Sequence, residues 1–234
     1  MKAWLAPLAA GIGAVLGAGA MWAAGGGGGR PETERIVHAY LLAHPEVISE
    51  AMGRLQDRET AKAVAANRAA IETPVGDAWA GNPRGDVTLV EFFDYNCGFC
   101  RASLPVVDRL VASDPNLRVV YRELPVLAES SRAAARVSLL AAEQGRFARF
   151  HQALYAAGPV TDATLAAAAR TAGVDTSKLA AAIPREDAAI HADLQLAAEL
   201  GMTGTPSWVV GDHVLIGAQP LDRLQAAIAE ARGR

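Results

Sequence analysis

The sequence contains almost no cysteine: Cys97 and Cys100 are the only two in 234 residues. A structural zinc site usually needs four nitrogen or sulfur ligands. There is no second cysteine pair to supply them, and no histidine stands close by in the sequence. Five histidines, at positions 38, 44, 151, 191 and 213, lack the spacing of a catalytic triad. They are interpreted as surface or packing residues.

An excess of positive charge is also missing. The 22 Lys and Arg residues are outnumbered by 25 Asp and Glu, which gives a net charge of −3 and a pI near 6.0. The basic residues are dispersed and form no stripe, so we expect no nucleic-acid partner. Hydrophobic residues make up 51% of the chain, which allows a sizeable core in one domain with attachments.

The amino terminus lacks charge after Lys2. Residues 3–24 are uncharged, and small residues near Ala18 offer a cleavage site, so residues 1–24 predict a secretory signal peptide. About 22 uncharged residues are also long enough to cross a bilayer as an uncleaved anchor. Either outcome predicts a periplasmic or other extracytoplasmic protein, where disulfides persist. The glycine run within residues 25–30 predicts a flexible linker.

Residues 31–72 predict a helical arm that is interrupted near Pro45, because proline disfavours helix at the residue before it. Leu41, Ile48 and Leu55 recur every seven residues. This pattern is compatible with an oligomerisation stalk, in which the apolar stripe packs against other copies of the chain. An arm that lies on its own domain is the alternative. The Ala-rich end of the arm has few large apolar residues, so we expect it to pack lightly.

Cys97-Gly98-Phe99-Cys100 lies between a predicted buried strand at 87–94 and a predicted helix at 101–112. Positions three apart share a helix face, so the two thiols can close a small disulfide ring. The free N–H groups and positive dipole end of a helix favour a thiolate over a thiol. We therefore predict a redox-active pair. A zinc site completed by a distant histidine and an inert structural disulfide are the alternatives.

The rest of the chain predicts a βαβ unit, a helical block and a late hairpin. A second strand at 117–124 follows the cysteine helix, so the two strands should be parallel. Residues 130–201 are almost entirely helical in pattern. Helices are predicted at 133–143, 146–155, 163–171 and 185–200, with breaks at Gly145, Gly158-Pro159, Gly173 and Ile183-Pro184, followed by a hairpin of 207–210 with 213–216 and a helix at 221–231.

Three motifs resemble the DsbA-like family. They are the 92–100 stretch around the cysteines, Glu123-Leu124-Pro125 at a strand end, and Gly204-Thr205-Pro206-Ser207 before the hairpin. The resemblance implies an α/β thioredoxin fold over residues 74–234, with a helical domain inserted at 130–201 and a helical arm preceding it. It also implies a cis peptide between Thr205 and Pro206 that faces the cysteines. X–Pro bonds tolerate this isomer.

The resemblance implies a role for each site residue. Cys97 is expected to be an exposed nucleophile, and Cys100 the buried thiol that resolves its mixed disulfide. Glu91 is a proton acceptor beneath Cys100, unless it is an outward carboxylate or is paired with an arginine. The residues expected to shape an apolar groove for clients are Phe99, Thr205, Pro206 and Trp208, although Phe99 and Trp208 are also read as plain core or surface aromatics.

The predicted function is thiol–disulfide exchange on unfolded or misoxidised exported proteins, with a membrane redox partner and no organic cofactor. The strongly oxidising family members carry Pro-His between their cysteines, whereas this chain carries Gly98-Phe99. We therefore expect a milder oxidant, similar to the oligomeric DsbC-type isomerases. Two rivals remain: a copper-binding or metal-tolerance protein that uses the same thiolates, and a non-catalytic adhesion or scaffold module.

Overall fold

The computed structural model describes residues 29–233. The predicted signal peptide or anchor at 1–24 lies outside the described residues. Contacts within the chain divide it into two units, Met1–Gln56 and Asp57–Arg234. Each unit is described by itself. The boundary lies within the segment that was predicted as the arm.

The described part of the first unit is helical. Helix α2 spans Gly29–Ala43, and α3 begins at Glu46 and ends at Glu72 in the second unit. The interruption falls at the predicted proline. Large apolar side chains of this unit face solvent, among them Ile48 and Leu55 at 53% and 46% exposed.

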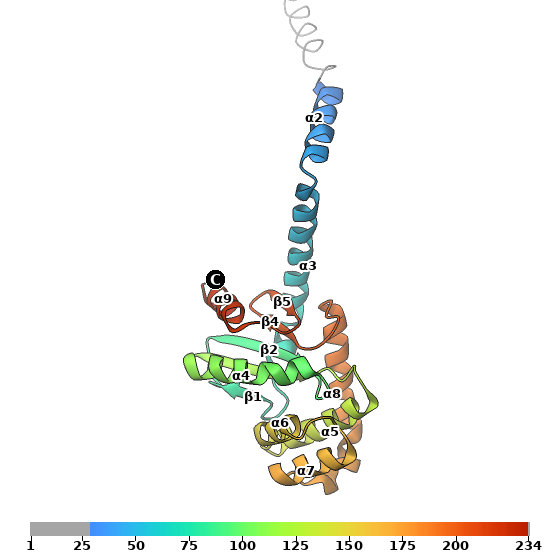
Figure 1. The fold of residues 1–234 in the computed structure, drawn as a ribbon, viewed down its shortest axis with the longest axis vertical. Helices are drawn as coiled ribbons and strands as arrows, with labels where there is room; N and C mark the ends of the chain where they lie inside the picture. Colours follow the sequence, from blue (N-terminus) through green and yellow to red (C-terminus); the bar gives the residue numbers. More distant parts are fainter. Residues whose placement is uncertain (1–28, 234) are drawn as a thin grey trace, which may run out of the picture. The chain divides into compact units, whose positions relative to one another are not determined.

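A five-stranded sheet forms the centre of the second unit (Figure 1), with the order β1-β3-β2-β4-β5. Strand β2 pairs in parallel with β3, and the other neighbours are antiparallel. The predicted βαβ unit and hairpin are therefore confirmed. The strands are β1 Trp79–Gly81, β2 Val87–Phe93, β3 Leu117–Glu123, β4 Ser207–Val210 and β5 His213–Ile216. The short edge strand β1 was not predicted, since three residues carry no periodic signal.

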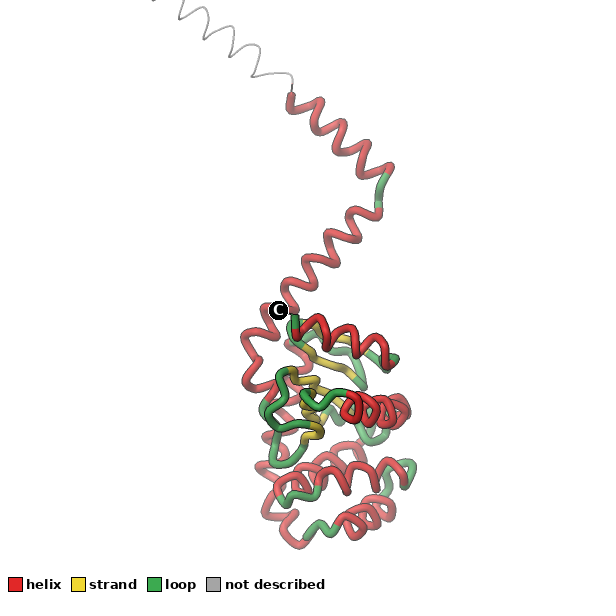
Figure 2. Tube along the Cα trace, turned by 90° about the vertical axis from the view of Figure 1, so that its left-hand side faces the viewer, coloured by secondary structure: helices red, strands yellow, loops and turns green. Residues whose placement is uncertain are grey.

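Helices α5 to α8 form the insertion between β3 and β4. Helices α5, α6 and α7 group together beyond the strands, whereas α8 runs back beside the sheet (Figure 1, Figure 2). The predicted break at Pro184 is wrong, because α8 continues through it. Proline removes one backbone donor but has a φ that suits a helix. The helices are α4 Gly98–Ser113, α5 Glu129–Glu143, α6 Phe147–Ala156, α7 Asp162–Ala172, the short 3₁₀ helix η1 Thr176–Lys178, α8 Leu179–Glu199 and α9 Leu221–Arg232.

The core lies on both faces of the sheet, because successive strand residues point to opposite sides. Leu89 and Phe93 pack with α4, α9 and the insertion, whereas Val90 and Phe92 pack in a second cluster on the other face. That second cluster includes Val64 and Ile71 of α3, at 1% and 0% exposed. The expectation that the end of the arm packs lightly is therefore wrong. These two large residues, seven positions apart, cover this face together with Leu196 and Leu200 at the end of α8.

Candidate active site

Cys97 lies where β2 leads into α4 and is the N-cap residue of that helix. Its backbone N–H donates to the Asp94 carbonyl at 3.0 Å, and its sulfur accepts from the Cys100 N–H at 3.3 Å. Both cysteines are free thiols in this structure. The start of α4 therefore supplies a backbone N–H donor to the Cys97 sulfur.

The Thr205–Pro206 peptide is cis, as the resemblance implied. It lies against the redox pair, since the Cys97 thiol donates to the Thr205 carbonyl at 3.2 Å. The Thr205 hydroxyl is buried and has no partner among the residues that the structure describes. A segment 108 positions away in sequence thus covers the Cys97 sulfur.

The expectation that Cys97 is exposed is wrong. Cys97 is only 5% exposed, rather than an open nucleophile, because the 205–206 segment packs on it. Cys100 is 1% exposed, one helical turn further on. Burial and the neighbouring Glu91 carboxylate raise the pKa of the Cys100 thiol far above its usual value. Cys100 therefore has to lose its proton to a nearby group before it can attack a disulfide.

Glu91 is a buried carboxyl whose charge acts on the Cys100 thiol, and it could accept this proton. It lies on β2 directly opposite Tyr121 of β3 and Trp208 of β4, and it is 3% exposed. Its side chain points to the α4 face of the sheet, the same face as Leu89 and Phe93, so the outward orientation is excluded. Burial, together with the negative charge of Cys97, raises the pKa of Glu91 to about 8.

The two aromatic residues that were expected to contact clients differ in their exposure to solvent. Phe99 is 68% exposed beside the redox pair. Trp208 is fully buried, and its indole N–H donates to the Gly217 carbonyl at 3.0 Å. The prediction that Trp208 lines a client groove is therefore wrong, because β4 is covered on both faces and leaves no surface for its side chain.

Asp94 is a site residue that sequence reasoning missed. One carboxylate oxygen accepts from the Asn96 N–H at 2.8 Å and from the Ser131 hydroxyl at 2.7 Å. The other accepts from the N–H groups of Val126 and Leu127, each at 3.0 Å. This 1% exposed carboxylate joins the cysteine turn to the segment after β3. An acid directly after an apolar strand was the available signal.

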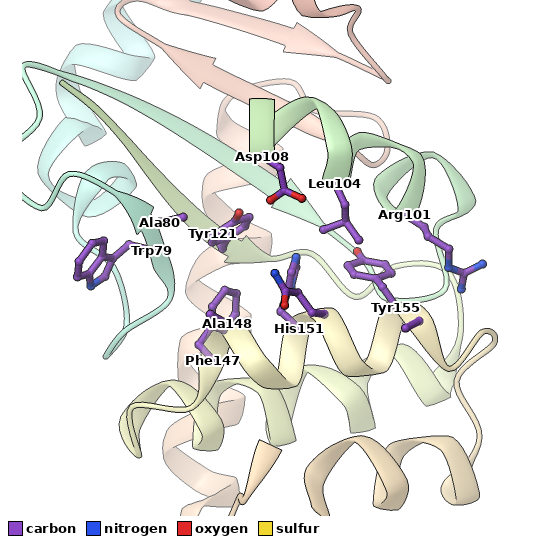
Figure 3. A pocket seen from close by; sticks show the side chains of 12 residues that line it. Trp79, Ala80, Arg101, Leu104, Asp108, Tyr121, Phe147, Ala148, His151 and Tyr155 are labelled. Atoms are coloured by element: carbon purple, nitrogen blue, oxygen red, sulfur yellow. The ribbon is translucent and has the colours of Figure 1, made fainter. Parts of the chain in front are cut away.

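A cavity of about 470 Å³ is lined by residues of β1, β3, α4 and α6. Figure 3 shows Arg101 and Asp108 of α4 on one side and His151 and Tyr155 of α6 on the other. The Tyr155 hydroxyl donates to the Asp94 carbonyl at 3.0 Å. Burial lowers the pKa of His151 to about 3, so the ring is neutral at pH 7. His151 is therefore a packing residue, as expected.

Within residues 29–233, no group of three or more Cys, His, Asp or Glu side chains is arranged to hold a metal ion. No helix in the same range has the length and apolar character needed to cross a bilayer.

Two thiols at a strand-to-helix junction, facing a cis-proline directly before the neighbouring strand, are typical of the thioredoxin fold. The model of the DSBA-like thioredoxin domain matches residues 88–229, more than half of the chain. The chain therefore belongs to the DSBA-like thioredoxin family. The model of the copper resistance protein ScsC N-terminal domain matches residues 32–62.

Solved structures agree with this assignment. A thioredoxin-like oxidoreductase from Silicibacter pomeroyi is 44% identical, with 67% of this chain and 92% of that chain covered and a TM-score of 0.64. A linker-deletion variant of Proteus mirabilis ScsC is 26% identical, with 87% and 95% covered and a TM-score of 0.73. A periplasmic thioredoxin-like protein from Salmonella enterica is 30% identical, with 71% and 96% covered and a TM-score of 0.63.

Curated relatives are much longer. Two Na(+)/H(+) antiporters NhaA, from Salinispora arenicola and Salinispora tropica, are 28% identical over 163 residues. The chain spans about a quarter of the length of these relatives.

Proposed function

We propose that this chain is a thiol–disulfide oxidoreductase that acts on exported proteins through Cys97 and Cys100. One observation carries the proposal. The Cys97 sulfur lies within hydrogen-bond distance of both the Cys100 N–H at the start of α4 and the Thr205 carbonyl before Pro206. A nucleophilic sulfur, a second thiol one turn away and a neighbouring backbone edge are the parts that disulfide exchange needs.

The proposed reaction proceeds in two exchanges. The Cys97 thiolate attacks one sulfur of a client disulfide, forms a mixed disulfide and releases the other client sulfur as a thiolate. Cys100 then attacks Cys97, closes the 97–100 disulfide and frees the remaining client sulfur. Its proton passes to Glu91, about a tenth of which is ionised at pH 7 if its pKa is about 8. Client oxidation is the same sequence in reverse.

Trapping the intermediate tests this assignment. Cys100→Ala should accumulate a mixed disulfide between Cys97 and a client that contains disulfides, because no second thiol remains to resolve it. Non-reducing electrophoresis and intact mass measurement would detect the complex. The matched control is Cys97→Ala/Cys100→Ala, which should give none. A Cys100→Ala protein that releases its client as fast as the unaltered chain would refute the role of Cys100.

The setting of the reaction is part of the proposal. The uncharged amino terminus supports export, and one structural neighbour is described as periplasmic. Unfolded or misoxidised exported proteins are then the clients, and a membrane redox partner returns the 97–100 pair to its working state. The uncharged Phe99 between the cysteines supports a milder oxidant than the Pro-His members of the family.

The segment at residues 31–72 is proposed as an oligomerisation stalk for the redox domain at 74–234. The supporting observation is the apolar surface of its first part, including Tyr40, Leu42 and Met52 at 53%, 70% and 64% exposed. Isolated monomers rarely keep so much apolar surface in water. The match of residues 32–62 to the ScsC N-terminal domain also supports a distinct module here.

Sedimentation measures the oligomeric state and so tests the stalk proposal directly. The chain lacking residues 1–24 should sediment as an oligomer, and Ile48→Ser/Leu55→Ser should shift it to the monomer. Arg54→Ser is the control, since its side chain is 77% exposed and paired only along the helix. A monomer at all concentrations for the unsubstituted chain would end the stalk proposal.

Copper binding is the second candidate, and the match to a copper resistance protein domain favours it. Two thiolates one helical turn apart suit a soft ion such as Cu(I). Anaerobic titration of the reduced protein with Cu(I) tests it. Stoichiometric binding that Cys97→Ala abolishes would support this candidate, and absence of binding would remove it.

A further inference from the structure

The cavity lined by β1, β3, α4 and α6 is separate from the redox pair, since neither cysteine lines it. Its volume of about 470 Å³ lies within the range of sites that bind small organic molecules. The walls are mostly apolar and aromatic, and Figure 3 shows Trp79, Phe147 and Leu104 around the cavity. The polar groups among these walls therefore decide which molecule fits.

His151 brings a buried polar atom to the cavity. Its side chain is 4% exposed and stacks on Phe147, with 5.0 Å between the ring centroids. Its Nδ1 lies 3.1 Å from the hydroxyl of Tyr95, which does not line the cavity. The other ring nitrogen, Nε2, points away from Tyr95, is buried, and has no hydrogen-bond partner within the described range 29–233. A buried polar atom without a partner costs free energy that a ligand can recover.

The hydrogen bonds behind His151 determine which of its nitrogens carries the proton. The Tyr95 hydroxyl lies 2.9 Å from the Ser138 hydroxyl, which is bonded in turn to the Glu123 side chain. Burial raises the pKa of Glu123 well above its usual value, so this carboxyl is protonated at pH 7 and donates to Ser138. Ser138 then donates to Tyr95, and Tyr95 donates to Nδ1. The neutral ring therefore holds its one proton on Nε2, which presents an N–H donor to the cavity.

Arg101 and Asp108 set the charge of the cavity, which both residues line from α4. Their charges have opposite signs, so an ionic ligand would meet a like charge as well as an opposite one. The Arg101 guanidinium donates through one nitrogen to the Gly158 carbonyl at 2.9 Å, whereas its buried Nε has no partner in the part of the chain that the structure describes. The unpaired groups are thus N–H donors, and an uncharged ligand with an acceptor atom would satisfy them.

We propose that this cavity is a binding site for a small, uncharged aromatic molecule that carries a hydrogen-bond-accepting oxygen. The rings of Trp79, Tyr121 and Phe147 cover the aromatic part of the ligand, and the His151 Nε2–H donates to its oxygen. This inference does not depend on the exchange reaction, because the residues that carry it take no part in that reaction.

Benzamide is a suitable probe, because it is an uncharged aromatic ring with one amide oxygen. Binding is read from the indole N–H signals of the ¹⁵N-labelled protein. The signal of Trp79, which lines the cavity, should shift saturably at millimolar benzamide, whereas that of the fully buried Trp208 should stay in place. Toluene, which lacks the oxygen, and benzoate, which is charged, should bind at least about tenfold more weakly.

Two substitutions separate the parts of the site. Ala148 lines the cavity (Figure 3), so Ala148→Phe should fill the space and abolish the Trp79 shift. His151→Phe keeps a ring but removes the donor, so benzamide should bind about tenfold more weakly while toluene binding stays the same. Arg149→Ala is the control, since Arg149 is an exposed neighbour on α6 that does not line the cavity, and it should leave both affinities unchanged.

Four results would overturn the proposal. They are the absence of a saturable Trp79 shift with benzamide, equal affinities for benzamide and toluene, unchanged benzamide binding in Ala148→Phe, and an unchanged benzamide-to-toluene ratio in a folded His151→Phe. Each can be measured without any disulfide chemistry, so failure of the cavity proposal and failure of the exchange proposal are separate outcomes.

Discussion

Cys97→Ala is expected to abolish disulfide exchange, with the rate of insulin reduction falling at least about 10³-fold. The reason is geometric. Cys97 is the N-cap of α4 and touches the segment before Pro206, whereas Cys100 is 1% exposed and has a raised thiol pKa. With Cys97 absent, the remaining thiol is both protonated and out of reach of a client.

Insulin turbidity with dithiothreitol as reductant measures this loss. Ser103→Ala provides the control, because it lies one turn beyond Cys100 on the same helix and donates only to the Phe99 carbonyl. It should retain most of the rate. Substantial activity in Cys97→Ala would move the reaction away from this pair and end the proposed mechanism.

Glu91→Gln is expected to change both catalysis and the pH dependence of stability. In catalysis, the variant lacks the group that takes the proton of Cys100. Release of the client from the mixed disulfide should slow by about 10²-fold, within the usual range for a general base. In the unsubstituted chain, the release rate should rise with pH through about 8, where Glu91 is half ionised, and level off above it. The variant should lack this inflection.

The stability effect has a definite sign. The pKa of Glu91 is about 8 in the folded protein and near 4.5 when unfolded. Between these values the folded state holds a proton that the unfolded state has lost, so stability falls as pH rises. The Glu91 contribution is complete below pH 4.5 and is lost progressively up to about pH 8. The full change is roughly 4–5 kcal/mol, from 1.36 kcal/mol per pKa unit.

Urea unfolding of the reduced protein at pH 5 and pH 8 checks this sign. The free energy of unfolding of Glu91→Gln, relative to that of the unsubstituted chain, should increase from pH 5 to pH 8, so that the variant becomes relatively more stable. Glu129→Gln, an exposed carboxylate at the start of α5, should give the same difference at both pH values. If the difference between Glu91→Gln and the unsubstituted chain is also the same at pH 5 and pH 8, then Glu91 is already ionised in the folded state at pH 5. The proton-acceptor role would then lose its basis.

Much of the fold could be predicted because its signals are local. The β4–β5 hairpin was visible in Gly211-Asp212 between two short apolar runs, and α4 in the spacing of its apolar residues. Strand β1 was not visible, because three residues become a strand only through their pairing with Val119 and its neighbours on β3.

The details of the site were less predictable, because they depend on residues that are distant in sequence. The local sequence around the cysteines was enough to predict that Cys97 and Cys100 lie at the start of a helix. The burial of Cys97 depends on Thr205, and the role of Asp94 depends on a segment more than 30 positions later. Trp208 was misjudged because a four-residue strand that is buried at every position has no alternation to show which side faces a client.

The insertion also sets the order in which the reactive centre is assembled. Strand β2 and the two thiols are synthesised well before Thr205, and the four helices of the insertion must follow before β4 can pair with β2. Contacts over such separations carry a large closure entropy and form late. Until β4 pairs with β2, the nascent chain therefore exposes both thiols without the Thr205–Pro206 segment that covers Cys97. The protein itself is therefore vulnerable to misoxidation until about its last eighth has been synthesised.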